Sequence, residues 1–105
     1  MNHADLHRSR GQEAKAEQLL REAIEKIPAN GDVYHALGLS LVRQKRNREA
    51  VEALEQAARL SPDNARYIYV YAVALDSSGD RGKAIMVLQG AQQRFPSDTD
   101  ILGAL

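Results

Sequence analysis

The chain has 105 residues, with 14 basic and 14 acidic side chains, a formal net charge of zero and no cysteine. This balance gives no global attraction to nucleic acid or to an anionic membrane, and the lack of cysteine excludes disulfides and thiolate ligands. The 44% apolar content is typical of a globular chain, and no apolar run approaches the roughly 18 residues of a membrane span.

Three prolines, Pro28, Pro62 and Pro96, lie 34 residues apart and divide the chain into copies. Before each proline an alanine, a leucine and an alanine recur with spacings of four and three residues, which place them on one face of an α-helix. These columns are Ala16, Leu20 and Ala23, then Ala50, Leu54 and Ala57, then Ala84, Leu88 and Ala91. A period of 34 residues predicts stacked helical hairpins.

Residues 1–28 are predicted to form a partial first repeat. Residues 1–10 would be the end of a leading helix, and Gly11 would lie in the turn before a second helix. Gly11 aligns with Gly79 two periods later, and Lys45 occupies the same position between them. We therefore expect a turn at each of these three positions.

Residues 31–64 and 65–98 are predicted to be two full repeats, and residues 99–105 the start of a truncated fourth. The leading helices show i, i+3, i+4, i+7 spacing, in Tyr34, Leu37, Gly38 and Leu41 and again in Ile68, Tyr71, Ala72 and Leu75. The stretch ARYIYVYAVALD, residues 65–76, has strand propensity. The 34-residue register outweighs that local preference and predicts a helix.

These residues resemble the tetratricopeptide repeat family, whose pattern is a bulky apolar residue, Leu-Gly, an apolar residue, then Ala, an apolar or aromatic residue, Ala and Pro. One copy runs from Tyr34 to Pro62 and the next from Ile68 to Pro96. The resemblance implies an all-α fold, a right-handed superhelical solenoid of antiparallel helix pairs. Residues 1–105 would be a single fragment of such a domain.

The resemblance also implies that a second face of the leading helices lines a concave groove for peptides. On this face we predict an apolar lining with polar flanks, namely Ala36, Leu39, Val42, Tyr69, Val70 and Val73, flanked by His35, Arg43, Arg66 and Asp76. An alternative is that part of this face packs against neighbouring repeats or a missing helix. The positions that clamp a chaperone's C-terminal carboxylate in the family hold no matching lysine and asparagine set here.

No catalytic set and no cofactor is predicted. His3 and His7 have the spacing of a two-histidine metal site, but we interpret this as coincidence and predict no metal. The basic run RQKRNR, residues 43–48, lacks interleaved aromatic residues, so we expect a solvated turn and no nucleic-acid partner. We also expect basic side chains at the edge formed by turns within repeats and acidic ones at the opposite edge.

The predicted function is a non-catalytic protein–protein interaction scaffold that binds a peptide or protein segment in its groove. One alternative is an assembly segment of a longer array that self-associates through exposed apolar ends, giving a homo-oligomer. Another is the regulatory region of a larger enzyme. We expect a soluble protein, cytoplasmic by default, with a periplasmic location left open because the chain resembles a fragment.

Overall fold

The computed structural model describes the backbone of residues 3–104, together with the side chains of residues 11–99, Ile101 and Gly103. This part of the chain is all-helical and contains no strand. The six helices are α1 (His3–Lys26), α2 (Gly31–Arg43), α3 (Asn47–Leu60), α4 (Ala65–Ser77), α5 (Arg81–Arg94) and α6 (Thr99–Ala104). The predicted all-α fold is confirmed, and the tyrosine-rich stretch is a helix, α4.

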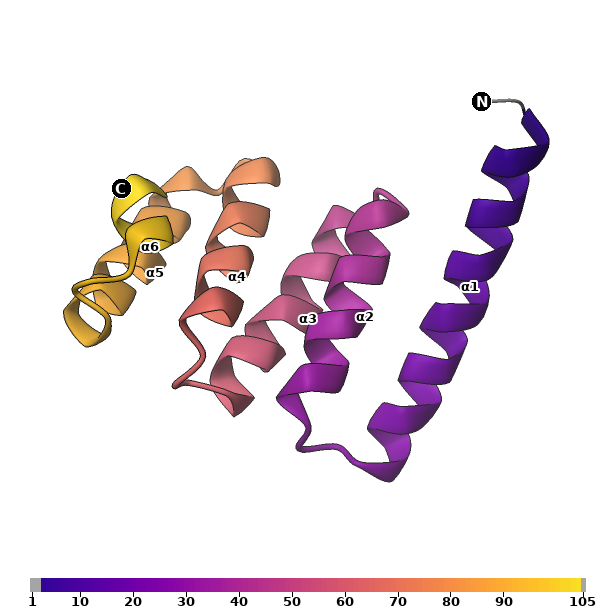
Figure 1. The fold of residues 1–105 in the computed structure, drawn as a ribbon, viewed down its shortest axis with the longest axis horizontal. Helices are drawn as coiled ribbons and strands as arrows, with labels where there is room; N and C mark the ends of the chain where they lie inside the picture. The colour runs from indigo at the N-terminus through magenta and orange to yellow at the C-terminus, as the bar shows by residue number, and fades with distance from the viewer. Residues whose placement is uncertain (1–2, 105) are drawn as a thin grey trace.

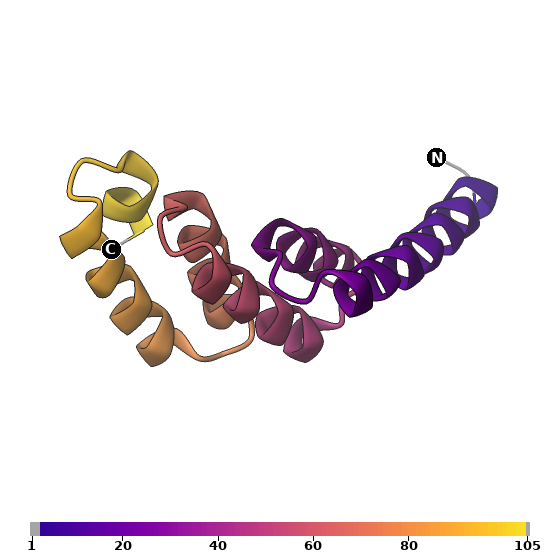
Figure 2. The same ribbon diagram turned by 90° about the horizontal axis from the view of Figure 1, so that it is seen from below.

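The helices stack in a row of antiparallel pairs (Figure 1). α2 pairs with α3 and α4 with α5, while α3 packs on α4 and α1 on α2. Figure 2 shows α2, α4 and α6 along one side of the row, α3 and α5 along the other, and the row bent toward the first side. We call the surface formed by α2, α4 and α6 on that side the concave face.

The repeated columns form the core between paired helices. Leu54 and Leu88, which occupy the same column, are 0% and 5% exposed, and the alanines around them are buried as well. Gly38 lets α2 approach α3 closely, because a Cβ added to it would lie 2.5 Å from Leu54 Cγ. The register read from the sequence thus fixes which helix faces meet.

The turns within the two full repeats share one geometry. Lys45 and Gly79 both have positive φ, at 61° and 90°. In each turn the next amide donates back to the helix, from Arg46 to the Leu41 carbonyl and from Asp80 to the Leu75 carbonyl, both at 2.9 Å. This is a Schellman motif, which satisfies carbonyls at the helix end.

The predicted turn at Gly11 is wrong, because α1 continues through it as one 24-residue helix. The residues after Gly11 include Gln, Glu, Ala and Lys, which are good helix formers. A single glycine inside such a helix costs only about 1 kcal/mol relative to alanine, less than breaking several backbone hydrogen bonds. Among the described residues no helix folds back on α1 as α3 does on α2, and the column residues Ala16, Leu20 and Ala23 of α1 are only half-buried.

Candidate functional site

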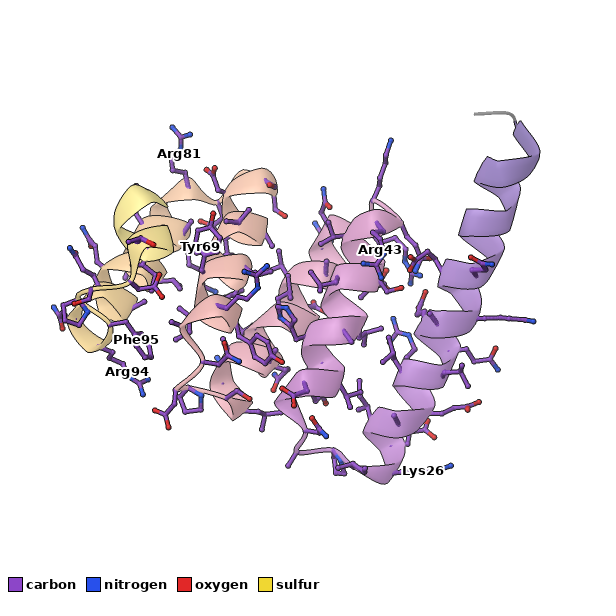
Figure 3. The ribbon with its side chains drawn as sticks, viewed as in Figure 1. Lys26, Arg43, Tyr69, Arg81, Arg94 and Phe95 are labelled. Carbon is purple, nitrogen blue, oxygen red and sulfur yellow. The ribbon has the colours of Figure 1, made fainter. Side chains whose placement is uncertain are left out.

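The concave face is built from a second stripe on α2 and α4, offset from the stripe that packs in the core. On α4 the stripe follows helical spacing from Arg66 through Val70 and Val73. Val42 on α2 and Val73 on α4 remain 41% and 44% exposed. Figure 3, viewed as in Figure 1 onto this side, shows Arg43 beside α1 and Tyr69 on α4.

An apolar cleft of about 120 Å³ lies between α2 and α4. Four of the residues predicted to line the groove surround it, namely Leu39, Val42, Val70 and Val73. Ala50 and Leu54 of α3 and Ala74 and Ser77 of α4 also contact it, together with Asn47. We call this feature the α2–α4 cleft. The structure therefore brings together residues from two repeats that are 28 to 34 positions apart in the sequence.

Beyond one end of the α2–α4 cleft, nearer the start of α4, two stacked rings pack between the helices. His35 lies against Tyr67 with ring centroids 4.0 Å apart and planes 14° apart. The Tyr67 hydroxyl donates to Asp32, and this bond raises the pKa of Tyr67. Burial, followed by the nearby Arg66 charge, lowers the pKa of His35. His35, predicted as a flanking contact, is thus buried against Tyr67, and its Nδ1 has no hydrogen-bond partner among the described residues.

Three more residues predicted for the groove, Ala36, Tyr69 and Asp76, lie on the leading helices α2 and α4. Ala36 is half-buried on α2, and Tyr69 is half-buried against the core cluster that includes Ile101. Asp76 is exposed and pairs with Arg81, with Oδ1 and Nε 3.1 Å apart. None of these three residues lines the α2–α4 cleft.

A polar network joins α1 to α2 and to the turn that follows. Glu13 accepts a bond from the fully buried Ser40 hydroxyl at 2.8 Å and pairs with Arg43. The Arg43 and Ser40 bonds lower the pKa of the Glu13 carboxyl. Glu17 pairs with Arg46 at 2.6 Å. Two arginines of the basic run are therefore neutralised by α1.

The expected separation of charge between the two edges is wrong. Arg81 pairs with Asp76 at the edge that holds turns within repeats, and Arg94 pairs with Asp63, 3.0 Å away, at the opposite edge. In Figure 3, Arg81 lies at the upper edge and Lys26 and Arg94 at the lower one. The helix dipole favours a cation at the C-terminal end of a helix, such as Arg94 at the end of α5. Basic residues therefore also lie at the edge for which the turns between repeats predicted acidic side chains.

Hollows larger than the α2–α4 cleft have more polar linings. One of about 380 Å³ is lined by Arg21, Glu49, Glu52 and Glu55 together with Tyr34 and neighbouring core residues. Its carboxylates Glu49 and Glu55 form ion pairs, and an apolar ligand would bury charged groups that it cannot hydrogen-bond. The α2–α4 cleft is smaller but apolar, so it is the better candidate for binding an apolar side chain.

Neither a metal cluster nor a membrane-crossing helix occurs in the described part of the chain. No three His, Cys, Asp or Glu residues there gather closely enough to hold a metal ion. The side chains of His3 and His7 lie outside the described set. None of the described helices combines the length and apolar character that crossing a bilayer requires.

The profile of one known family, Tetratricopeptide repeat, matches residues 35–99. The chain belongs to the tetratricopeptide repeat family. The solved structure of MamA 41-end from Desulfovibrio magneticus RS-1 superimposes with a TM-score of 0.76 at 20% identity, covering 84% of this chain and 50% of MamA. That likeness shows a shared helical solenoid fold.

Among curated proteins, Uncharacterized protein y4yS from Sinorhizobium fredii (strain NBRC 101917 / NGR234) is 33% identical over 91 residues. The match covers 87% of this chain and 50% of y4yS, so the chain spans half the length of that relative. Tetratricopeptide repeats are typically non-catalytic interaction modules. The family assignment therefore makes this chain a helical repeat scaffold of the kind that binds proteins.

Sequence reasoning missed Tyr67, which contacts both His35 and Asp32. Tyr67 aligns with Val33 in the preceding repeat, so its column gave no polar signal. An available signal was that both leading helices carry aromatic rings near their starts, including His35 and Tyr67, since consecutive leading helices lie side by side in a solenoid.

Proposed function

We propose that the concave face binds an extended segment of another protein, with an apolar side chain of that segment in the α2–α4 cleft. The observation that supports this most strongly is the cleft itself, where Val42 and Val73 remain 41% and 44% exposed beside Leu39 and Val70. A cleft of about 120 Å³ is smaller than typical sites for small molecules, which occupy about 300–1,000 Å³. It suits a single side chain of a peptide.

The proposal is tested with Val73→Glu and the matched control Ile85→Glu. Val73 and Ile85 are aliphatic and similarly exposed, at 44% and 41%, but Ile85 lies on α5, outside the cleft. Random peptides displayed on phage are selected on the purified chain, and the affinity of the selected peptides is measured by fluorescence anisotropy. Both variants should stay folded, because the new carboxylate remains at the surface.

Val73→Glu is expected to weaken binding at least tenfold, since a buried aliphatic side chain of the peptide contributes about 1.5–3 kcal/mol. Ile85→Glu should stay within twofold of the wild type. Equal losses in both variants, or no loss in Val73→Glu, would overturn the proposal. No role in catalysis or nucleic-acid binding is proposed.

A second candidate function is self-association through α5. Ile85 is 41% exposed and Met86 is 71% exposed, and the position equivalent to Met86 in α3 holds Glu52. An exposed apolar pair on α5 favours contact with another helix. In that case Ile85→Glu changes the mass measured by light scattering on a sizing column while Val73→Glu does not. The same two variants thus distinguish the candidates.

A further inference from the structure

The charges on α2 and α4 indicate which kind of peptide the concave face would select. This inference rests on the proposed function, because it concerns the occupant of the same cleft. We propose that the occupant is an extended peptide with one acidic side chain two or three residues from an apolar side chain. Arg66 pairs with the acid while the apolar side chain enters the α2–α4 cleft.

The first argument is charge compensation. The two leading helices carry four charged side chains. Arg43 pairs with Glu13, and Asp76 pairs with Arg81.

Asp32 accepts the hydroxyl of Tyr67. Arg66 is exposed and forms no hydrogen bond or ion pair with any residue whose side chain the structure describes. On α2 and α4, Arg66 is therefore the one cation without an ion pair among the described residues, while Asp32 keeps its negative charge because its partner is a neutral hydroxyl. A carboxylate of the peptide complements Arg66.

The second argument is position. Arg66 lies in the first turn of α4, on the same stripe as Val70 and Val73. With a rise of 1.5 Å per residue, these valines lie about 6 Å and about 10 Å further along the helix. An extended peptide advances about 3.3 Å per residue. An acidic residue and an apolar residue two or three positions apart thus match the distance from Arg66 to the cleft.

The third argument limits the number of acidic residues. The position equivalent to Arg66 in the preceding repeat is Asp32, a carboxylate. A second acidic side chain directed along the face toward α2 would meet a like charge, which disfavours it. The peptide that fits carries a single acid rather than an acidic run.

Peptides are selected from a random phage-displayed library on the purified chain. The enriched sequences are compared as a population, and individual peptides are synthesised for binding measurements. Enriched sequences should share Asp or Glu two or three residues from Leu, Ile, Val or Phe. Replacing that acid by Asn or Gln should weaken binding about fivefold at low ionic strength. The same change in the peptide should not alter its affinity for the Arg66→Gln variant, because the ion pair between Arg66 and the acid is already absent there.

A charge swap separates a direct contact from damage to the fold. Arg66→Glu should weaken the acidic peptide about tenfold or more, and a peptide with Lys in place of the acid should recover most of that loss. Arg48→Glu is the matched control, since Arg48 is an exposed cation in the first turn of α3 without an ion pair among the described residues. Binding by that control should stay within twofold of the wild type.

The outcomes are distinguishable. Peptides that depend on Val73 but show no preference for an acid, or no rescue in the charge swap, would overturn this inference and leave the proposed function standing. Selected peptides that are insensitive to both Val73→Glu and Arg66→Glu would overturn both. Preference for an acidic run over a single acid would contradict the role given to Asp32.

Discussion

Gly38 determines how closely α2 and α3 pack, and replacing it with alanine tests the packing that the 34-residue register creates. A Cβ at this position would lie 2.5 Å from Leu54 Cγ and 2.6 Å from Leu54 Cδ2. Carbon atoms in contact normally stay about 3.5–4.0 Å apart. Leu54 is 0% exposed, so relieving this contact requires the two helices to separate or the Leu54 side chain to shift into the adjoining α2–α4 cleft.

The expected magnitude combines two opposing effects. An extra methyl group in a packed core costs about 1–3 kcal/mol, and contacts this short favour the upper half of that range. Alanine in place of glycine inside a helix contributes about 0.8–1 kcal/mol of stability. The net effect of Gly38→Ala should be a loss of about 1–2 kcal/mol in the free energy of unfolding, and each kcal/mol lowers Tm by about 4–8 °C.

The assay is urea and thermal unfolding followed by far-UV circular dichroism, with Gly90→Ala as the control. Gly90 lies inside α5, and a Cβ there meets nothing within 4 Å. Gly90→Ala should therefore raise the free energy of unfolding by about 0.5–1 kcal/mol. If Gly38→Ala stabilises the protein as much as Gly90→Ala does, the close α2–α3 contact is refuted.

Two further predictions concern a turn and a buried ring. Lys45 has a left-handed backbone conformation with φ of 61°. Lys45→Gly should therefore raise the free energy of unfolding by about 0.5–1 kcal/mol, and Gly79→Ala should lower it by about 1 kcal/mol in the same urea titration. A lower free energy of unfolding in Lys45→Gly would contradict the assigned turn. Burial and Arg66 lower the pKa of His35 from its ordinary 6.5, so the unfolded chain binds the proton first and stability falls as pH drops below about 6.5. His35→Phe keeps a ring against Tyr67 and should flatten the dependence of stability on pH between about pH 6.5 and 5, which is above the range in which carboxylates with lowered pKa values titrate. An unchanged slope would show that another group causes the pH dependence.

The helices and the core were predictable because they repeat. Period and spacing identified Leu54 and Leu88 as core residues and α4 as a helix despite its tyrosines. This works because buried columns recur wherever the same hairpin recurs. The turn predicted at Gly11 was wrong because a single glycine followed by good helix formers costs too little to end a helix, and α1 continues through it.

The site was predictable as a stripe but not in its contacts. Helical spacing placed Leu39, Val42, Val70 and Val73 on one surface, and these four residues line the α2–α4 cleft. The ring stack of His35 on Tyr67 depends on how closely α2 and α4 approach each other, and the spacing within one helix does not encode that approach. The pairing of Arg43 with α1 was missed for the same reason, since it joins residues 30 positions apart.

The most direct test of peptide binding on the concave face is to map a selected peptide by NMR. Backbone amide shifts of the isotope-labelled chain are recorded as the peptide is added. Binding in the α2–α4 cleft predicts that the largest changes fall on Leu39, Val42, Val70 and Val73, with smaller ones at Arg66. Changes concentrated on the outer side of α3 and α5 would contradict the account.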